Sequence, residues 1–342
     1  MEFVCYKNWN KLPQDASEFF ALAGKESIFF SQPWFNNLVT HGLDEDQSIV
    51  FACVLDQGRL VALLPLDKQS STHYHSLTHL YTSLSTLLLA NHDQQAIIDC
   101  LVAGLRKLPV EFLQITPIAD NDSNLLLLQE RLENSGYTCQ RNFQFYNWFH
   151  RTNGETFAEY MSARPSRVRN TIDRKMRKLQ REHGYNIRLF THKNLRQGIV
   201  DYNSVYTTSW KAEEQFVGFV EGLAEQLFNQ GWLRLAVLYI GDVPAAAQFW
   251  FVANGKASIF KLVYDQFWKK YSPGTILTAY LMRHVIKVDK VDEIDFLTGN
   301  DAYKQEWMSQ RRERYRLSCY IPAAPKSLPN RLKQKVSTML KS

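Results

Sequence analysis

The chain of 342 residues lacks the features that mark several common classes of protein. No stretch approaches the roughly 18 uninterrupted apolar residues that a membrane-spanning helix needs. The first ten residues, MEFVCYKNWN, do not combine a basic start with an apolar run, so we expect no secretory signal. There is no Walker or dinucleotide glycine motif and no readable Ser-His-Asp arrangement. Nucleotide-hydrolysing, NAD-dependent and serine-hydrolase chemistry are therefore disfavoured.

Cysteine is also sparse. The five cysteines, at positions 5, 53, 100, 139 and 319, are scattered, odd in number and form no CxxC pair. We predict reduced, mostly buried thiols in a cytoplasmic protein. Three histidines lie close together in HYHSLTH (73–79), but without a cysteine nearby they do not form a typical zinc site. No metal site is predicted.

What is present is typical of a globular protein. Hydrophobic residues make up 45% of the chain, aromatic residues 13% and charged residues 22%. The length allows two domains, each with its own core. We place the boundary near residue 150, so that 1–150 and 151–322 form the two domains and 323–342 form a basic C-terminal tail.

Positive charge is confined to two stretches. Residues 164–181 hold eight basic side chains and one acid, and residues 326–342 hold five basic side chains and no acid. Because the net charge of the whole chain is only +6, the remainder is net acidic. The charge therefore describes two surfaces and not the whole protein.

Both halves show the same order of expected elements. In the first half, a hairpin around the turn at 56–59 is followed by a helix (93–108), a strand (111–117), a helix (123–136) and a strand that ends near 150. In the second half, a basic helix and a strand (185–190) precede a helix around 201–210 and a three-strand meander (233–265). A helix from about 272, a strand (293–299), a helix (301–308) and a last strand (314–321) complete it. We interpret this as an internal repeat of two α+β domains, with mixed, mostly antiparallel sheets flanked by helices.

This order resembles that of the GCN5-related N-acetyltransferase (GNAT) fold. The corner LENSGY (132–137) is similar to one corner of that fold. The segments RVRNTIDRKMRKLQREHG (167–184), YDQFWKKYSPGTIL (264–277) and IDFLTGNDAYKQEW (294–307) resemble the acetyltransferase-like proteins of cellulose biosynthesis (the CelD-like family). That family is related to Fem-type aminoacyl transferases, which use a doubled GNAT fold. The resemblance covers 150–320 well and the first half by element order alone.

The resemblance implies that acyl-coenzyme A is the co-substrate and that its pyrophosphate lies at the start of the helix near 272. Backbone N–H groups and the helix dipole favour an anion there. The implied donor-binding residues are Lys269, Lys270, Ser272, Gly274 and Thr275, with Gln248 on a strand whose small residues (245–247) could let the pantetheine arm pair with its backbone. The alternative is that Ser272 caps the helix and the lysines are solvated. The corresponding helix start in the first half has no glycine and carries Asp93, so we interpret that copy as degenerate.

Catalytic candidates follow from the same resemblance. Tyr303 could protonate the departing thiolate, and Asp265 or Asp295 could accept a proton from the attacking amine. Each also has a structural alternative, namely core packing beside Trp307 for Tyr303 and strand-end turns for the two aspartates. For the acceptor we name Arg167, Arg169 and Trp210.

The function expected from this resemblance is transfer of an acyl group from acyl-CoA to an amine. The acceptor is a small molecule or an amine linked to a polysaccharide or peptide. The alternatives are a Fem-type transferase that uses aminoacyl-tRNA and a non-catalytic adaptor that binds RNA or another polymer through the basic helix. The tail could contact a partner or an anionic membrane surface, or it could be a frayed terminus.

Overall fold

The computed structural model describes residues 1–45 and 47–321. The basic tail predicted for 323–342 lies outside the described residues. The strands of the first half are β1 (Glu2–Tyr6), β2 (Ile49–Asp56), β3 (Arg59–Lys68), β4 (His73–Ser76), β5 (Leu88–Leu89), β6 (Phe112–Ala119) and β7 (Thr138–Arg151). Its helices are η1 (Trp9–Lys11), α1 (Ala16–Ala23), η2 (Ile28–Phe30), α2 (Gln32–His41), α3 (Gln94–Leu105) and α4 (Ser123–Asn134).

The second half has the same kinds of element. Its strands are β8 (Asn186–Phe190), β9 (Leu233–Ile240), β10 (Val243–Ala253), β11 (Lys256–Tyr264), β12 (Glu293–Thr298) and β13 (Gln310–Tyr320). Its helices are α5 (Phe157–Ser162), α6 (Ser166–Glu182), α7 (Leu195–Thr207), α8 (Val217–Asn229), η3 (Gln266–Tyr271), α9 (Pro273–His284), η4 (Val285–Asp289) and α10 (Ala302–Trp307).

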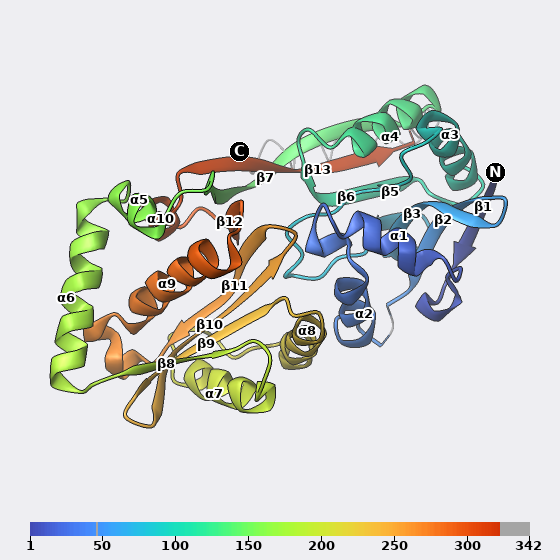
Figure 1. The fold of residues 1–342 in the computed structure, drawn as a ribbon. Coiled ribbons are helices and arrows are strands. Elements are labelled where there is room, and N and C mark those ends of the chain that lie inside the picture. The colour runs from blue at the N-terminus through green and yellow to red at the C-terminus, as the bar shows by residue number, and fades with distance from the viewer. Residues whose placement is uncertain (46, 322–342) are drawn as a thin grey trace.

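All of these strands join in one mixed sheet of 13 strands (Figure 1). The order is β1-β2-β3-β4-β6-β13-β7-β12-β11-β10-β9-β8, with β5 paired to β3. Neighbours are antiparallel except for β4 with β6 and β11 with β12, which are parallel. From one end of the sheet the first six strands are β1-β2-β3-β4-β6-β13, and from the other end they are β8-β9-β10-β11-β12-β7. Each set therefore contains a meander, a parallel pair and a final strand. The α+β class with a large mixed sheet flanked by helices is confirmed.

The final strands of the two halves are exchanged. β13, the last strand among the described residues, lies between β6 and β7 of the first half. β7 is long enough to pair with β13 along most of its length and with β12 near its end. The division into domains near residue 150 therefore remains a prediction, because the backbone ladder runs without a break through both halves.

Helices cover the sheet according to their apolar faces. In the second half α6 and α9 pack on one face, and α7 and α8 pack on the other, while α3 and α4 cover the first half (Figure 1). One core joins α2 of the first half to α8 of the second, where the Asn37 side-chain amide donates to the Phe219 carbonyl at 3.0 Å. No helix within 1–45 or 47–321 is long and apolar enough to cross a bilayer.

The prediction that all five cysteines are reduced thiols is wrong in this structure. Cys139 on β7 and Cys319 on β13 form a disulfide across directly opposed positions of the two antiparallel strands, with their Cα atoms 4.1 Å apart. The two cysteines are 180 residues apart in sequence, so only the pairing of the two exchanged strands brings them together. Cys5, Cys53 and Cys100 are thiols, of which Cys53 is buried.

Candidate active site

The candidate site lies where two neighbouring strands separate. β11 and β12 pair only over their first three positions, from Lys256 opposite Glu293 to Ser258 opposite Asp295. Beyond them the pairing of β12 with β7 is irregular, and Leu297 takes a positive φ of 52° that a leucine rarely adopts. The next residues of β11 pair with β10 on one side only. An open strand edge therefore faces the gap between β11 and β12.

A cavity of about 740 Å³ occupies this gap. One side is formed by α6, α9 and α10, through residues that include Val168, Gly274, Thr278 and Trp307. The other side is formed by Leu80, Tyr81 and Ser83 from the first half and by Trp210 and Lys211 after α7. The cavity is therefore reached from both faces of the sheet, as a site for two reactants requires.

The start of α9 borders the cavity through Gly274 and Thr275. Ser272 adopts φ 54° and its side chain makes no capping hydrogen bond, so it does not cap the helix as the structural alternative expected. Pro273 takes the first helical position, where its missing N–H costs nothing. At Gly274 a Cβ would lie 3.2 Å from the Tyr264 ring. Glycine thus keeps the helix close to β11 and leaves its first turn open to the cavity.

Three of the other donor-binding candidates lie elsewhere. Gln248 is fully buried, where its amide donates to the Gly274 carbonyl at 2.9 Å and to Thr278 Oγ1 at 2.7 Å. It therefore positions the start of α9. Lys269 and Lys270 are not among the residues that line the cavity, and the Lys270 ammonium lies 5.0 Å from the centre of the Tyr271 ring.

Among the catalytic candidates, only Tyr303 lines the cavity. Its ring lies 5.7 Å from that of Phe296, and burial together with the Asp301 charge raises the pKa of Tyr303 to about 12. A tyrosine with the ordinary pKa is also protonated at neutral pH, so the candidacy of Tyr303 rests on its place at the cavity. Asp265 instead accepts a hydrogen bond from the Phe267 backbone N–H at 2.9 Å, which is a turn-capping role.

Asp295 faces away from this cavity, toward a seam between the two halves. It is 4% exposed and accepts a hydrogen bond from Arg312 at 2.6 Å. Burial alone would raise the pKa of Asp295, but the nearby Arg312 and Lys256 charges and two hydrogen bonds hold it below its ordinary value. A buried carboxylate so firmly paired is a weak base.

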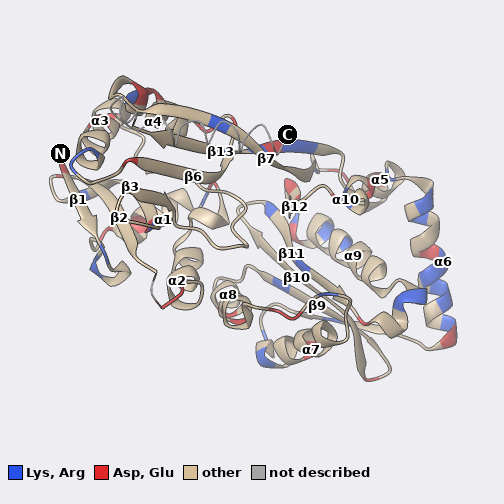
Figure 2. Ribbon diagram, turned by 180° about the vertical axis from the view of Figure 1, so that it is seen from behind, with Lys and Arg blue, Asp and Glu red and all other residues tan. Residues whose placement is uncertain are grey.

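Of the three acceptor-binding candidates, two line the cavity and one does not. Arg167 lines the cavity and pairs with Glu306. Trp210 also lines it, with its ring 4.3 Å from that of Tyr264. Arg169 is not among the lining residues, and its guanidinium donates to the Ser162 carbonyl at 3.1 Å. Figure 2 shows the positions of Lys and Arg gathered along the ribbon of α6.

Sequence reasoning missed a charged cluster on the side of the cavity that Tyr81 and Lys211 line. Lys261 on β11 is 7% exposed and pairs with Glu214 at 2.6 Å, and Glu214 also accepts from the Tyr81 hydroxyl. Lys211 lines the cavity beside them, and burial followed by repulsion from Lys261 lowers the pKa of Lys211 to about 8. The available signal was a single lysine within the apolar strand SIFKLVY (258–264).

The proposed pairing of a pantetheine arm with the strand 245–252 is wrong. That strand is part of β10, which is hydrogen-bonded to β9 on one side and to β11 on the other. Its small residues are buried between the two cores. The open edge belongs to β11 instead.

The equivalent gap in the first half is filled by the chain itself. β4 and β6 also pair in parallel over three positions, but the loop after β4 then bonds to β6. The Ser85 N–H donates to the Pro117 carbonyl at 2.6 Å, and the Ser85 hydroxyl donates to the Thr116 carbonyl at 3.1 Å. Within the described residues no cluster of three or more His, Cys, Asp or Glu could hold a metal ion.

Comparison with known proteins agrees with this geometry. Residues 166–305 match the family model described as an acetyltransferase (GNAT) domain. The match runs from the start of α6 into α10 and so contains the gap between β11 and β12. No curated protein sequence matches the chain at a significant level.

Solved structures share the fold over most of this chain. FemX is similar over 94% of this chain and 98% of its own, with a TM-score of 0.63 and 9% identity. The C-terminal domain of a putative lysylphosphatidylglycerol synthetase from Agrobacterium fabrum covers 89% and 91%, with a TM-score of 0.59 and 13% identity. A tandem GNAT protein from the clavulanic acid pathway covers 94% and 99%, with a TM-score of 0.50 and 12% identity. At such identities the likeness shows a GNAT-type fold, and the CelD-like resemblance stays a prediction.

Proposed function

We propose that the protein is an N-acyltransferase that moves an acyl group, such as acetyl, from coenzyme A to an amine. The observation that carries the proposal is the cavity in the gap between β11 and β12. It is bordered by the start of α9 on one side and by Tyr81, Trp210 and Lys211 on the other. The donor enters along α9 and the acceptor enters from the side of the first half.

The donor side fits an elongated anionic thioester. Gly274 and Thr275 present the first turn of α9, and Arg167 and Thr171 of α6 stand on the same side. A helix start and a nearby guanidinium both favour phosphate oxygens. The open edge of β11 offers backbone groups to the amides of a pantetheine arm. Bound acyl-CoA supplies the activated carbonyl carbon.

The chain's own residues would handle the protons. Lys211, with its pKa near 8, is partly neutral at physiological pH and would accept the proton that the ammonium of the acceptor must lose. Backbone N–H groups on β11 would stabilise the oxygen that becomes negative as the amine adds to the thioester. Tyr303 would donate its proton to the departing thiolate. We thus replace Asp265 and Asp295 by Lys211 as the proposed base.

One observation favours a second candidate, the Fem-type reaction with aminoacyl-tRNA. The arginines of α6 at 167, 174, 177 and 181 are exposed, and the first of them borders the cavity. A polyanion on this helix would have its reactive end near the gap. We prefer coenzyme A, because a single basic helix is a narrow footprint for tRNA.

The two reactions are separated by direct binding and transfer. Calorimetry should show acetyl-CoA binding to the full chain, and mass spectrometry of a mixture of amines with acetyl-CoA should show a product heavier by one acetyl group. Filter binding with total tRNA at two salt concentrations provides the comparison. Tight, salt-sensitive capture of tRNA without acetyl-CoA binding would replace the proposal by the Fem-type reaction, and capture without any transfer would support the adaptor.

A further inference from the structure

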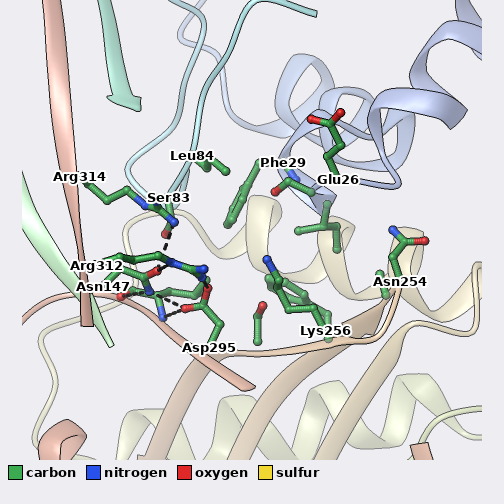
Figure 3. Close-up of a pocket in the computed structure, with 16 residues that line it drawn as sticks. Glu26, Phe29, Ser83, Leu84, Asn147, Asn254, Lys256, Asp295, Arg312 and Arg314 are labelled. Atoms are coloured by element: carbon green, nitrogen blue, oxygen red, sulfur yellow. Dashed lines mark hydrogen bonds and ion pairs between the residues drawn. The ribbon is translucent and has the colours of Figure 1, made fainter. Parts of the chain in front are cut away.

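A second, smaller cavity of about 40 Å³ lies in the seam between the two halves (Figure 3). Its walls come from the segment around η2 and from Ser83 and Leu84 of the first half, from β10, β11 and β12, and from the exchanged strands β7 and β13. Ser83 and Leu297 line both this seam cavity and the candidate active site. The two cavities are therefore neighbours that share a wall.

Two arginines on β13 converge on the seam cavity, and the first is fully engaged. Arg312 makes a bidentate pair with Glu293, at 2.8 and 3.2 Å, and donates to Asp295 at 2.6 Å. Its Nε donates to Asn147 Oδ1, also at 2.6 Å. Each of the three guanidinium nitrogens of Arg312 therefore has an acceptor, and Arg312 holds the two halves together at the seam.

The second arginine lacks such partners. Arg314 is 7% exposed, and its single side-chain acceptor among the described residues is the same Asn147 Oδ1, at 3.3 Å. Its Nε has no acceptor in the part of the chain that the structure describes. Figure 3 shows the side chain extending from β13 toward Ser83. A buried guanidinium with unused donors is destabilising unless acceptors meet them, and an anion meets them best.

The charges around the cavity are equal in number but unevenly placed. Three cations, Arg312, Arg314 and Lys256, face two carboxylates, Asp295 and Glu293. A third carboxylate, Glu26, stands at the exposed rim, and Figure 3 shows it directed away from the arginines. The three cations and three carboxylates are therefore equal in number, and the unmet demand lies in the free donors of Arg314. A carboxylate offers two oxygens to such donors in the planar geometry that a guanidinium prefers.

We propose that Arg314 binds a carboxylate in the seam cavity, and that the amine acceptor supplies this carboxylate. The small volume accommodates the two oxygens of a carboxylate. Because Ser83 and Leu297 line both cavities, an acceptor bound across them would place its carboxylate at Arg314 and its amine in the larger cavity. The acceptor is therefore an amino acid or a short peptide with a nearby free carboxylate. This assignment rests on the proposed acyl transfer, but carboxylate binding at Arg314 does not.

The binding experiment uses formate and acetate as probes, with the full chain, at constant ionic strength set by chloride. The melting temperature of the wild type should rise with either probe. Arg314→Gln should abolish the rise, and Arg314→Lys should weaken binding roughly 10- to 100-fold, because a lysine cannot offer the planar pair of donors. Arg311→Gln, on the exposed part of the same strand, is the matched control and should respond as the wild type does.

The transfer experiment compares glycine with glycinamide and short peptides with their C-terminal amides. With the wild type the free acids should have KM values at least tenfold lower than the amides, and Arg314→Lys should remove this preference. If no amine is acetylated but formate binding depends on Arg314, the proposed transfer fails and the carboxylate site stands. Equal KM values for acids and amides would overturn the acceptor assignment. No response of the wild type to either probe, or an equal response in Arg314→Gln, would overturn the carboxylate site itself.

Discussion

Lys211 is the side chain whose charge state matters most to the proposed chemistry. It lines the larger cavity beside the buried pair of Lys261 with Glu214, and its pKa falls from an ordinary value of 10.5 to about 8. Below about pH 8 the folded protein therefore holds an ammonium in a place that disfavours it. Between about pH 8 and 10.5 the unfolded chain still binds this proton while the folded chain does not.

Stability should consequently rise with pH in that window. The free energy of unfolding of the wild type should increase between pH 8 and 10 relative to that of Lys211→Met, because the unfolded state binds more protons there. Chemical denaturation at several pH values measures the free energy of unfolding of both proteins. Groups that titrate equally in the two proteins cancel when one free energy is subtracted from the other. Parallel curves for the two proteins would show that Lys211 keeps its ordinary pKa.

Tyr303 can be tested without disturbing the packing of its ring. Tyr303→Phe keeps the contact with Phe296 and removes only the hydroxyl. Turnover should fall on the order of a hundredfold, the usual contribution of a general acid, while acetyl-CoA affinity and melting temperature change little. A lower melting temperature with unchanged turnover would assign Tyr303 to packing alone.

Of the sequence candidates that line the larger cavity, those on the side of α9 and α10 share a simple property. Gly274, Thr275 and Tyr303 belong to segments whose order along the chain already puts them beside the gap. The surroundings of Asp295 and Gln248 could not be predicted from the order of segments, because their hydrogen-bond partners lie on other elements of the chain. For Asp295 the deciding contact is with Arg312, which only the position of β13 provides.

The start of α9 is the element on which donor binding depends. Gly274→Asp would place a bulky, negative side chain at the second residue of the helix, where the anion should lie. Acetyl-CoA affinity should fall at least tenfold, about 1.4 kcal/mol. The chain offers a matched control in Gly218, the second residue of α8, where an added Cβ meets only His41 at 3.8 Å.

Gly218→Asp should leave the affinity unchanged. Because Gly274 lies close to the Tyr264 ring, Gly274→Asp also requires a melting curve to show that it folds. A folded Gly274→Asp protein with wild-type affinity would mean that the first turn of α9 does not contact the donor.

Element order was the best prediction from sequence, and strand partners were the worst. The meander, the helix after it and the strand beyond each lie where periodicity put them, because these patterns are local. Helix α8 was not foreseen, and neither was the exchange of β7 and β13. Strand exchange leaves no mark in local periodicity, since a strand shows the same alternation whichever partner it pairs with.

The whole chain should behave as one folding unit. In residues 1–151 alone β6 loses one neighbour and β7 loses both, and in 152–342 alone β12 loses one neighbour and β13 loses both. We expect residues 1–151 and 152–342 each to aggregate when expressed alone, because open strand edges pair with other chains. Co-expression of the two pieces should give a soluble 1:1 complex, detected by size-exclusion chromatography. A monomeric, cooperatively unfolding 1–151 fragment would contradict this expectation.

The position of β13 also has a consequence for the synthesis of the protein. Cys139 on β7 and the opposed Cys319 on β13 are 180 residues apart in sequence. The first half therefore leaves the ribosome long before β13 has been synthesised. At about 5–20 residues per second the delay is roughly 10–40 s. During that time β6 and β7 stand without their shared neighbour. The nascent chain therefore needs protection over this interval, from a chaperone or from temporary pairing of its own strands.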